Sequence, residues 1–464
     1  MRATALDIRL ATLGLLAAAA WLASPAAAGV RLVERPGQST AIRAAVTIDG
    51  TVRSRGGSDR IEERPLKATA RFGFLETRLD NTDTAITDPG QIRVVRNYLE
   101  ADADIVIDGQ ASKTSLPEDA RRIAVVGRPE GPLKFSPTAL LMRESVDLLD
   151  MPGDPLALVA LLPDPNDEIE VDDTWTPADW AGQMLCSIDA IAKTELSCKL
   201  KSADQSQAVI EVTGRVEGAR LGAYSKINLA GVMALDLEKQ LIVSASFNYS
   251  ESAEIGTITP GVLSTTSVRL ARQPARQPVP ATDVPADVPD EALQLYFDAG
   301  PWNVRLQHSR DWHIYFAQLD ADPKVVILRK LDGGNLQCQC NIALIPPATP
   351  GEHTPLAQFE ADIRRTLGPR FTQITARDQY AGAGGVRIFR TDVAGQAAAP
   401  ADGTAPKPIN WTYYLIAAPD GRQLSAIFAH EPGEDQNLGG EDIDIVRTIE
   451  FFGNLAADRR STQR

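Results

Sequence analysis

A stretch dense in proline, from Arg272 to Asp290, constrains the fold of this chain more than any other feature. It carries five prolines, at positions 274, 278, 280, 285 and 289. Proline fixes the backbone φ angle and removes an amide donor, so neither a helix nor an interior strand persists through such a stretch. We therefore predict an extended linker at 272–290 between a part at 29–271 and a part at 291–454, with a frayed tail at 455–464.

The N-terminus has the pattern of a secretory signal over residues 1–28. Arg2 and Arg9 give it a positive start, an apolar run of 13 residues follows, and three alanines ending at Ala28 offer a cleavage site. The run is shorter than the roughly 20 residues that cross a bilayer. We therefore expect cleavage after Ala28, export to the periplasm or the extracellular space, and no transmembrane segment in the mature chain.

Composition excludes two classes of protein. The chain has 47 basic and 61 acidic residues and a net charge of −14, and an anionic surface does not attract phosphate backbones over long range. We therefore expect no nucleic-acid partner. Hydrophobic residues make up 44% and charged residues 23%, which excludes wholesale disorder.

Segments that alternate apolar and polar residues dominate 29–271, most clearly at 241–250. One helix interrupts them at 136–149, where Ser136 offers a cap and Ala139, Met142 and Val146 share one face. This pattern predicts a β-rich domain with a curved antiparallel sheet around a single helix.

The part at 291–454 alternates strand and helix signals. A helix is predicted at 355–367, where Phe359, Ile363 and Leu367 lie on one face, and a second short helix is predicted after Gly440. The predicted strands are 302–306, 312–317, 324–330, 335–345, 370–379, 385–393, 409–417 and 422–430. For the whole chain we expect an α+β fold, with the β-rich domain followed by an antiparallel-sheet α/β sandwich.

Several residues of the C-terminal part carry a family resemblance. Pro301-Trp302, the segment Ser309–Trp312, the helix Pro355–Leu367 and the hairpin formed by 410–416 and 420–428 occur in the order typical of a known sandwich. In this respect 291–454 resembles the PsbP/Mog-like α/β/α sandwich. The resemblance implies a non-catalytic binding or assembly module.

The N-terminal part carries a shorter signature. The sequence Asp172-Asp-Thr-Trp175 resembles the Gly-Asp-x-Trp pattern of uncharacterised exported β-rich bacterial proteins, with Asp172 standing where glycine is usual. The resemblance implies a half-barrel similar to that of lipoprotein carriers.

The four cysteines suggest structural roles. Cys186 and Cys198 are separated by eleven residues that suit two antiparallel strands and a turn, which predicts a disulfide in an oxidising compartment, with two small buried apolar residues as the alternative. Cys338 and Cys340 point to one face of a strand, and we interpret them as buried thiols.

Histidine, the residue most used for proton transfer near neutral pH, is confined to the C-terminal part. We interpret His308, His313, His353 and His430 as surface or edge residues. The only dense glycine cluster, 382–385, lacks a phosphate-binding pattern and is interpreted as a turn. The sequence therefore predicts no catalytic residue, no cofactor site and no metal site.

These features favour an exported, non-catalytic binding or envelope-assembly protein, with an unidentified protein or an apolar small molecule as its partner. An exported hydrolase is the first alternative, working through a carboxylate pair or through a metal near His308, His313 and Glu431. A structural surface component is the second.

Overall fold

The computed structural model describes residues 29–34, 39–56, 60–79, 88–277, 280, 284–285, 287–399, 404–433 and 438–453. The predicted signal at 1–28 and the predicted tail at 455–464 lie outside these residues. Strands account for 55% of the structure and helices for 15%. The predicted α+β class is therefore wrong: the fold is built from large antiparallel sheets with helices as minor elements. Long strands that pair with their sequence neighbours need only turns between them, which leaves little chain for helices.

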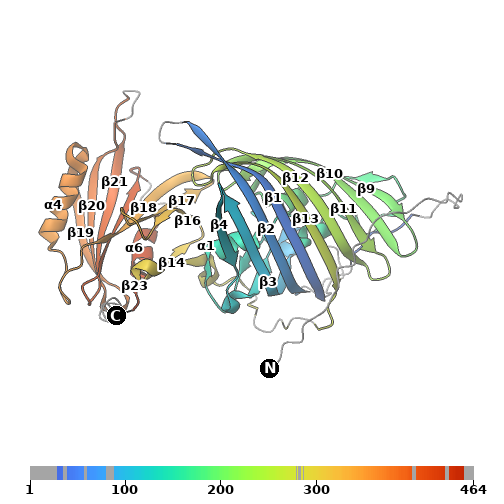
Figure 1. Cartoon of the computed structure of the whole chain (residues 1–464), viewed down its shortest axis with the longest axis horizontal. Helices are drawn as coiled ribbons and strands as arrows, with labels where there is room; N and C mark the ends of the chain where they lie inside the picture. Colours follow the sequence, from blue (N-terminus) through green and yellow to red (C-terminus); the bar gives the residue numbers. More distant parts are fainter. Residues whose placement is uncertain are drawn as a thin grey trace.

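A sheet of 12 strands forms most of the N-terminal part, and Figure 1 shows it as one broad curved surface. Its strands are β1 (Ser39–Arg55), β2 (Ile61–Arg78), β3 (Arg93–Ile107), β4 (Gln110–Ser115), β5 (Arg122–Val126), β6 (Leu133–Phe135), β8 (Thr174–Trp175), β9 (Ala190–Ala203), β10 (Gln207–Arg220), β11 (Ala223–Asp236), β12 (Leu241–Ala253) and β13 (Gly261–Pro274). Strand β1 pairs with both β2 and β13, so the first and last long strands of this part lie side by side.

The alternation of side chains gives this sheet an apolar inner face. In β1, for example, Ile42, Ala44 and Val46 are buried while Arg43 and Ala45 are exposed. The inward-facing residues of the long strands join with apolar residues of three short helices in one hydrophobic core. The inner face is therefore the side on which a site can be enclosed.

Three helices pack on the inner face instead of the single predicted helix. They are α1 (Arg143–Leu149), α2 (Pro155–Val159) and α3 (Asp179–Cys186). The prediction of one helix at 136–149 is corrected in its start, because Leu141–Met142 forms a short strand, β7, and the helix begins only at Arg143. Leu141 pairs with Leu295, far along the chain, and this pairing overrides the local helical pattern.

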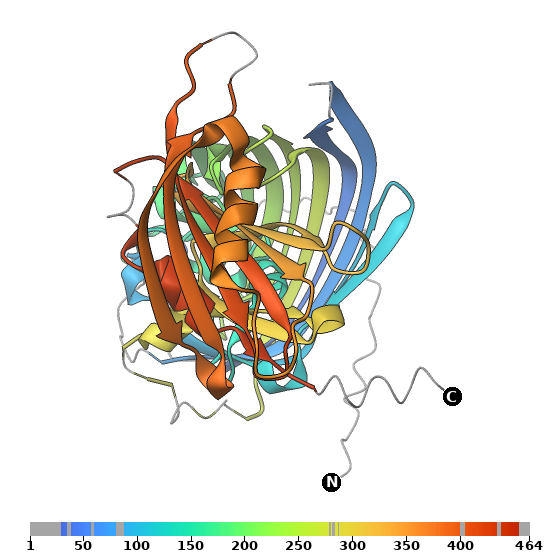
Figure 2. The ribbon, with the colours of Figure 1, turned by 90° about the vertical axis from the view of Figure 1, so that its left-hand side faces the viewer.

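The C-terminal part has a seven-stranded antiparallel sheet. Its strands are β16 (Trp312–Gln318), β17 (Val325–Asp332), β18 (Asn335–Ile345), β19 (Phe371–Ala381), β20 (Arg387–Gln396), β21 (Pro408–Ala417) and β22 (Gln423–His430). Together with β15 (Val304–Ser309), they confirm all eight predicted strands, with ends shifted by at most three residues. The predicted helices are also present as α4 (Leu356–Leu367) and α6 (Glu441–Arg447). Figure 2 shows α4 in front of this sheet, with the long sheet behind it.

A small third sheet links the two parts of the chain. Its order is β23 (Glu450–Phe451), β15, β14 (Gln294–Ala299) and β7, so that a strand of the N-terminal part completes a sheet of the C-terminal part. The proline-rich stretch also contacts the long sheet, because the Pro285 carbonyl accepts a hydrogen bond from Arg93 of β3 at 3.0 Å. The division into domains at 272–290 stays a prediction.

Candidate functional site

A chamber with a volume of about 350 Å³ lies between the inner face of the long sheet and helix α1. Its wall is apolar and comes from β1, β2, β3 and α1 with the turn that follows it. The apolar residues are Val46, Ile48, Ala68, Ala70, Phe72, Ala103, Ile105, Leu148, Met151 and Pro152. The volume lies at the lower end of the range of small-molecule sites, roughly 300–1,000 Å³.

Small side chains at paired positions create this space. Ala70 of β2 pairs with Val46 of β1 and with Ala103 of β3, so one row across three strands carries two alanines. In the next row of paired residues on the same face, Phe72 of β2 lies between Ala44 of β1 and Ala101 of β3. Its side chain is larger than that of Ala70 and fills more of the space. The chamber is therefore made by the choice of residue size on a continuous sheet, and larger side chains would close it.

Charged side chains also line the chamber, and the exposed ones, Glu144 and Asp147, mark its mouth. Glu144 and Asp147 of α1 and Asp150 just beyond it provide three carboxylates, and Arg220 at the end of β10 provides one guanidinium. Arg220 donates a hydrogen bond to Asp150 at 3.4 Å. The lining residues of the chamber thus carry a net negative charge.

Asp147 lies in an unusual environment for a carboxylate. Water reaches it within the chamber, yet protein atoms surround the group, and this loss of solvation raises the pKa of Asp147 to about 6. Arg143 and Arg220 act against the shift, whereas Asp150 and Glu144 add to it. Asp147 therefore changes charge close to neutral pH.

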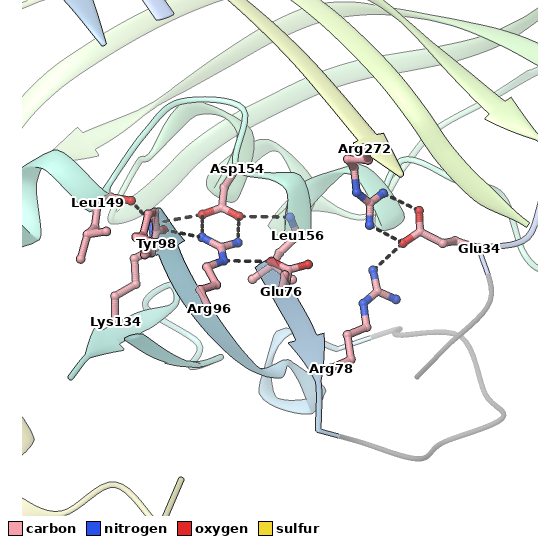
Figure 3. Close-up of polar contacts among 10 residues, drawn as sticks. All are labelled: Glu34, Glu76, Arg78, Arg96, Tyr98, Lys134, Leu149, Asp154, Leu156 and Arg272. Atoms are coloured by element: carbon pink, nitrogen blue, oxygen red, sulfur yellow. Dashed lines mark hydrogen bonds and ion pairs between the residues drawn. The ribbon is translucent and has the colours of Figure 1, made fainter. Parts of the chain in front are cut away.

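A buried network of ion pairs and hydrogen bonds holds α1 and α2 against the sheet (Figure 3). Arg96 of β3 donates to Asp154 through both terminal nitrogens, at 3.0 and 2.5 Å, and to Glu76 through Nε at 2.9 Å. Lys134 lies 3.2 Å from Asp154 and donates to the Leu149 carbonyl at 2.7 Å. These cations hold the pKa of Asp154 well below its usual range despite its burial.

A second buried cluster lies beside the first, as Figure 3 also shows. Glu34 accepts hydrogen bonds from Arg272 of β13 at 2.7 and 2.9 Å and from Arg78 of β2 at 2.6 Å. The two guanidinium groups lower the pKa of Glu34 to about 2, although its burial acts in the opposite direction. Both clusters tie distant segments of the N-terminal part together, and none of their residues is among those that line the chamber.

The structure places the predicted cysteine sites in the cores. Cys186 ends α3 and Cys198 lies in β9, where both are buried thiols, and the predicted disulfide between them stays a prediction. Burial raises the pKa of Cys186, and that of Cys198 to about 12. Cys338 and Cys340 of β18 are buried, as predicted.

The prediction that the histidines are surface or edge residues is wrong for three of the four. His308, His313 and His430 are buried. Their strand neighbours, such as Leu295 beside His308 and Asn410 beside His430, come from other segments of the chain. Burial lowers the pKa of His308 to about 4 and that of His313 to about 3, with Arg143 of α1 adding to both shifts. Across the described residues, no three His, Cys, Asp or Glu side chains gather to hold a metal ion.

Sequence reasoning did not find the chamber, although one signal was present. The inward positions of β2 carry alanine at 68 and 70 between larger apolar residues at 66 and 72. Such small residues at alternate positions leave space if a second layer covers the strand. Whether the space is covered depends on the position of α1, which the sequence did not reveal.

Comparison with known proteins identifies no close relative. No family model matches the chain, and no curated protein matches it. Among solved structures, one of lipid–protein interactions in lipovitellin matches at 7% identity and a TM-score of 0.30, covering 53% of this chain and 26% of the lipovitellin chain. The chain thus spans about a quarter of that protein.

Two outer-membrane proteins of Pseudomonas aeruginosa match over more of the chain but with less similarity. OccK5 (OpdH) matches at 8% identity and a TM-score of 0.13, covering 85% of this chain and 97% of its own. OpdK matches at 7% identity and a TM-score of 0.11, covering 85% of this chain and 98% of the OpdK chain. These scores are too low to define a shared fold. In the part of the chain that the structure describes, no helix combines the length and apolar character needed to span a bilayer.

Proposed function

We propose that this protein is an exported, non-catalytic binding protein that holds an apolar molecule in the chamber. The observation that carries the proposal is an open space of about 350 Å³ with an apolar wall on the inner face of the long sheet. Removing apolar ligand surface from water supplies roughly 25 cal/mol per Å², so a ligand that fills such a chamber gains several kcal/mol. The export of the chain rests on residues 1–28.

The buried ion pairs support this proposal because they fix the chamber in the absence of ligand. Arg96 and Asp154 join β3 to the start of α2, and Lys134 joins β6 to the end of α1. A preformed wall avoids the cost of ordering side chains on binding. The C-terminal part, with its resemblance to PsbP/Mog-like modules, is in this proposal the region that contacts a protein partner.

A fluorescence titration with N-phenyl-1-naphthylamine tests the proposal, because this uncharged probe emits strongly only in apolar surroundings. We expect saturable binding by the purified protein. Ala70→Leu should weaken binding on the order of tenfold by filling the chamber. The matched control is Ala45→Leu on the exposed outer face of β1, which should leave binding unchanged.

Thermal unfolding of both variants shows whether each is folded. The proposal is overturned if the wild-type protein gives no saturable signal, or if folded Ala70→Leu binds the probe as tightly as the control does.

A further inference from the structure

The mouth of the chamber carries a charge pattern that bears on which apolar molecules it accepts. Glu144 and Asp147 are three residues apart on α1, so they lie on the same face of the helix, and both line the chamber. Leu148, which follows them, lines the apolar wall. A ligand whose chain enters the chamber therefore places its polar end beside these two carboxylates.

The cations near the mouth make their direct hydrogen bonds and ion pairs with groups other than Glu144 and Asp147. Arg220 donates to Asp150, with Glu251, Asp189 and Asp147 also close enough to raise its pKa. Arg143 donates to the backbone carbonyl groups of Arg310 and Trp312 in the C-terminal part. Lys134, which lies 3.6 Å from Asp150, is held by Asp154 and by the Leu149 carbonyl.

Glu144 and Asp147 form no direct contact of this kind, although the charges of Arg143 and Arg220 both act to lower the pKa of Asp147. Within the described residues, neither carboxylate lies within 4.0 Å of a Lys, Arg or His nitrogen. Both are accessible to solvent inside the chamber. A positively charged group at this point would gain two ion pairs in a recess where water screens charge less than on an open surface. An anionic group would meet like charge instead.

We propose that the chamber selects amphiphiles with one apolar chain and a protonated amine head group, which Glu144 and Asp147 bind. This inference rests on the proposed function, because it names the class of molecule that enters the same chamber. Both carboxylates are exposed, so each ion pair of this kind contributes little, and an anion at the same place is disfavoured to a similarly small degree. Because these effects add, the preference for the cation over the anion should reach on the order of tenfold.

Displacement of N-phenyl-1-naphthylamine by two probes with the same chain tests the inference. Dodecylammonium and dodecanoate are compared at pH 7.5, below the concentrations at which they form micelles. We expect dodecylammonium to displace the dye at about a tenth of the concentration that dodecanoate requires. The variant Glu144→Gln with Asp147→Asn should bring the two concentrations close together.

The matched control removes the same charge from the outer face of the sheet. Glu63→Gln with Asp104→Asn changes exposed residues of β2 and β3 and should keep the preference for the cation. Equal displacement by the two probes in the wild-type protein, or tighter binding of dodecanoate, overturns the inference while leaving the proposed function intact. If neither probe displaces the dye, the proposed function fails as well.

Discussion

Arg96 and Asp154 form a bidentate ion pair in the interior, with nitrogen–oxygen distances of 3.0 and 2.5 Å and both side chains at most 3% exposed. Arg96 belongs to the long sheet, whereas Asp154 precedes α2 and accepts a hydrogen bond from the Leu156 amide at 3.1 Å. One side chain thus both caps a helix and fastens it to the sheet. This pair sets the position of α2, which follows the chamber-lining residues Met151 and Pro152.

Asp154→Ala should lower the free energy of unfolding by about 3–5 kcal/mol, because Arg96 keeps its charge in the interior with Glu76 as the carboxylate that remains and the Tyr98 hydroxyl 3.5 Å away. Urea denaturation followed by circular dichroism measures the loss. Asp298→Ala, which removes a partner of Arg305 at a surface pair 2.9 Å long, serves as the control and should cost less than about 1 kcal/mol. Equal losses for the two variants would show that the buried pair does not fasten the helix.

Two glycines in turns of different sheets meet at the junction of the two parts. Gly222 lies between β10 and β11 with φ of +75°, and a Cβ atom there would lie 2.5 Å from the carbonyl oxygen of Gly334. Gly222→Ala should therefore destabilise the protein by about 1–3 kcal/mol more than Gly109→Ala. Gly109 has a similar φ of +78° but open space around it, so only the backbone strain is shared. Chemical denaturation compares the variants, and similar values would mean that the contact relaxes freely.

His308 and His313 make the protein sensitive to acid. Their pKa values in the folded state, about 4 and about 3, lie below the value of about 6.5 for an unfolded chain. The stability that they contribute is present above pH 6.5 and is lost as the pH falls toward 4, by roughly 1.4 kcal/mol per pH unit for each residue.

The variant His308→Gln with His313→Gln should therefore lose less stability than the wild-type protein between pH 6.5 and pH 4. Urea midpoints at half-unit intervals of pH measure the difference. Parallel curves for the two proteins over this range would rule out the buried neutral histidines as the cause.

Sequence patterns predicted the elements whose signals are local. The face of Phe359, Ile363 and Leu367 repeats at helical spacing, and α4 follows it from Leu356 to Leu367. The strands of the seven-stranded sheet also carry their own alternation and turns. These elements need no knowledge of distant partners.

Contacts between distant segments account for what was missed. The start of α1 depends on the pairing of Leu141 with Leu295, and the position of α2 depends on the ion pair between Arg96 and Asp154, 58 residues apart. His308 has the sequence surroundings of an edge residue, yet it is buried, and Arg143 of the N-terminal part lies close enough to lower its pKa. The α+β prediction failed because the sequence patterns indicated the helices but not how long the strands are. The long strands make up a much larger share of the structure than the helices.

Asp147 should make stability depend on pH in the opposite sense to the histidines. Its pKa in the folded protein, about 6, lies above the ordinary value of 3.8, so ionisation opposes folding. The stability that its neutral form contributes is fully present below pH 3.8 and is lost as the pH rises through 6. The stability of Asp147→Asn should thus match that of the wild-type protein near pH 4 and exceed it at pH 7, by no more than about 1 kcal/mol because solvent screens the charge.

Denaturation midpoints of the two proteins from pH 4 to pH 8 measure this divergence, with Asp104→Asn on the outer face as the control. A constant difference across the range would mean that the chamber does not desolvate the Asp147 carboxyl group.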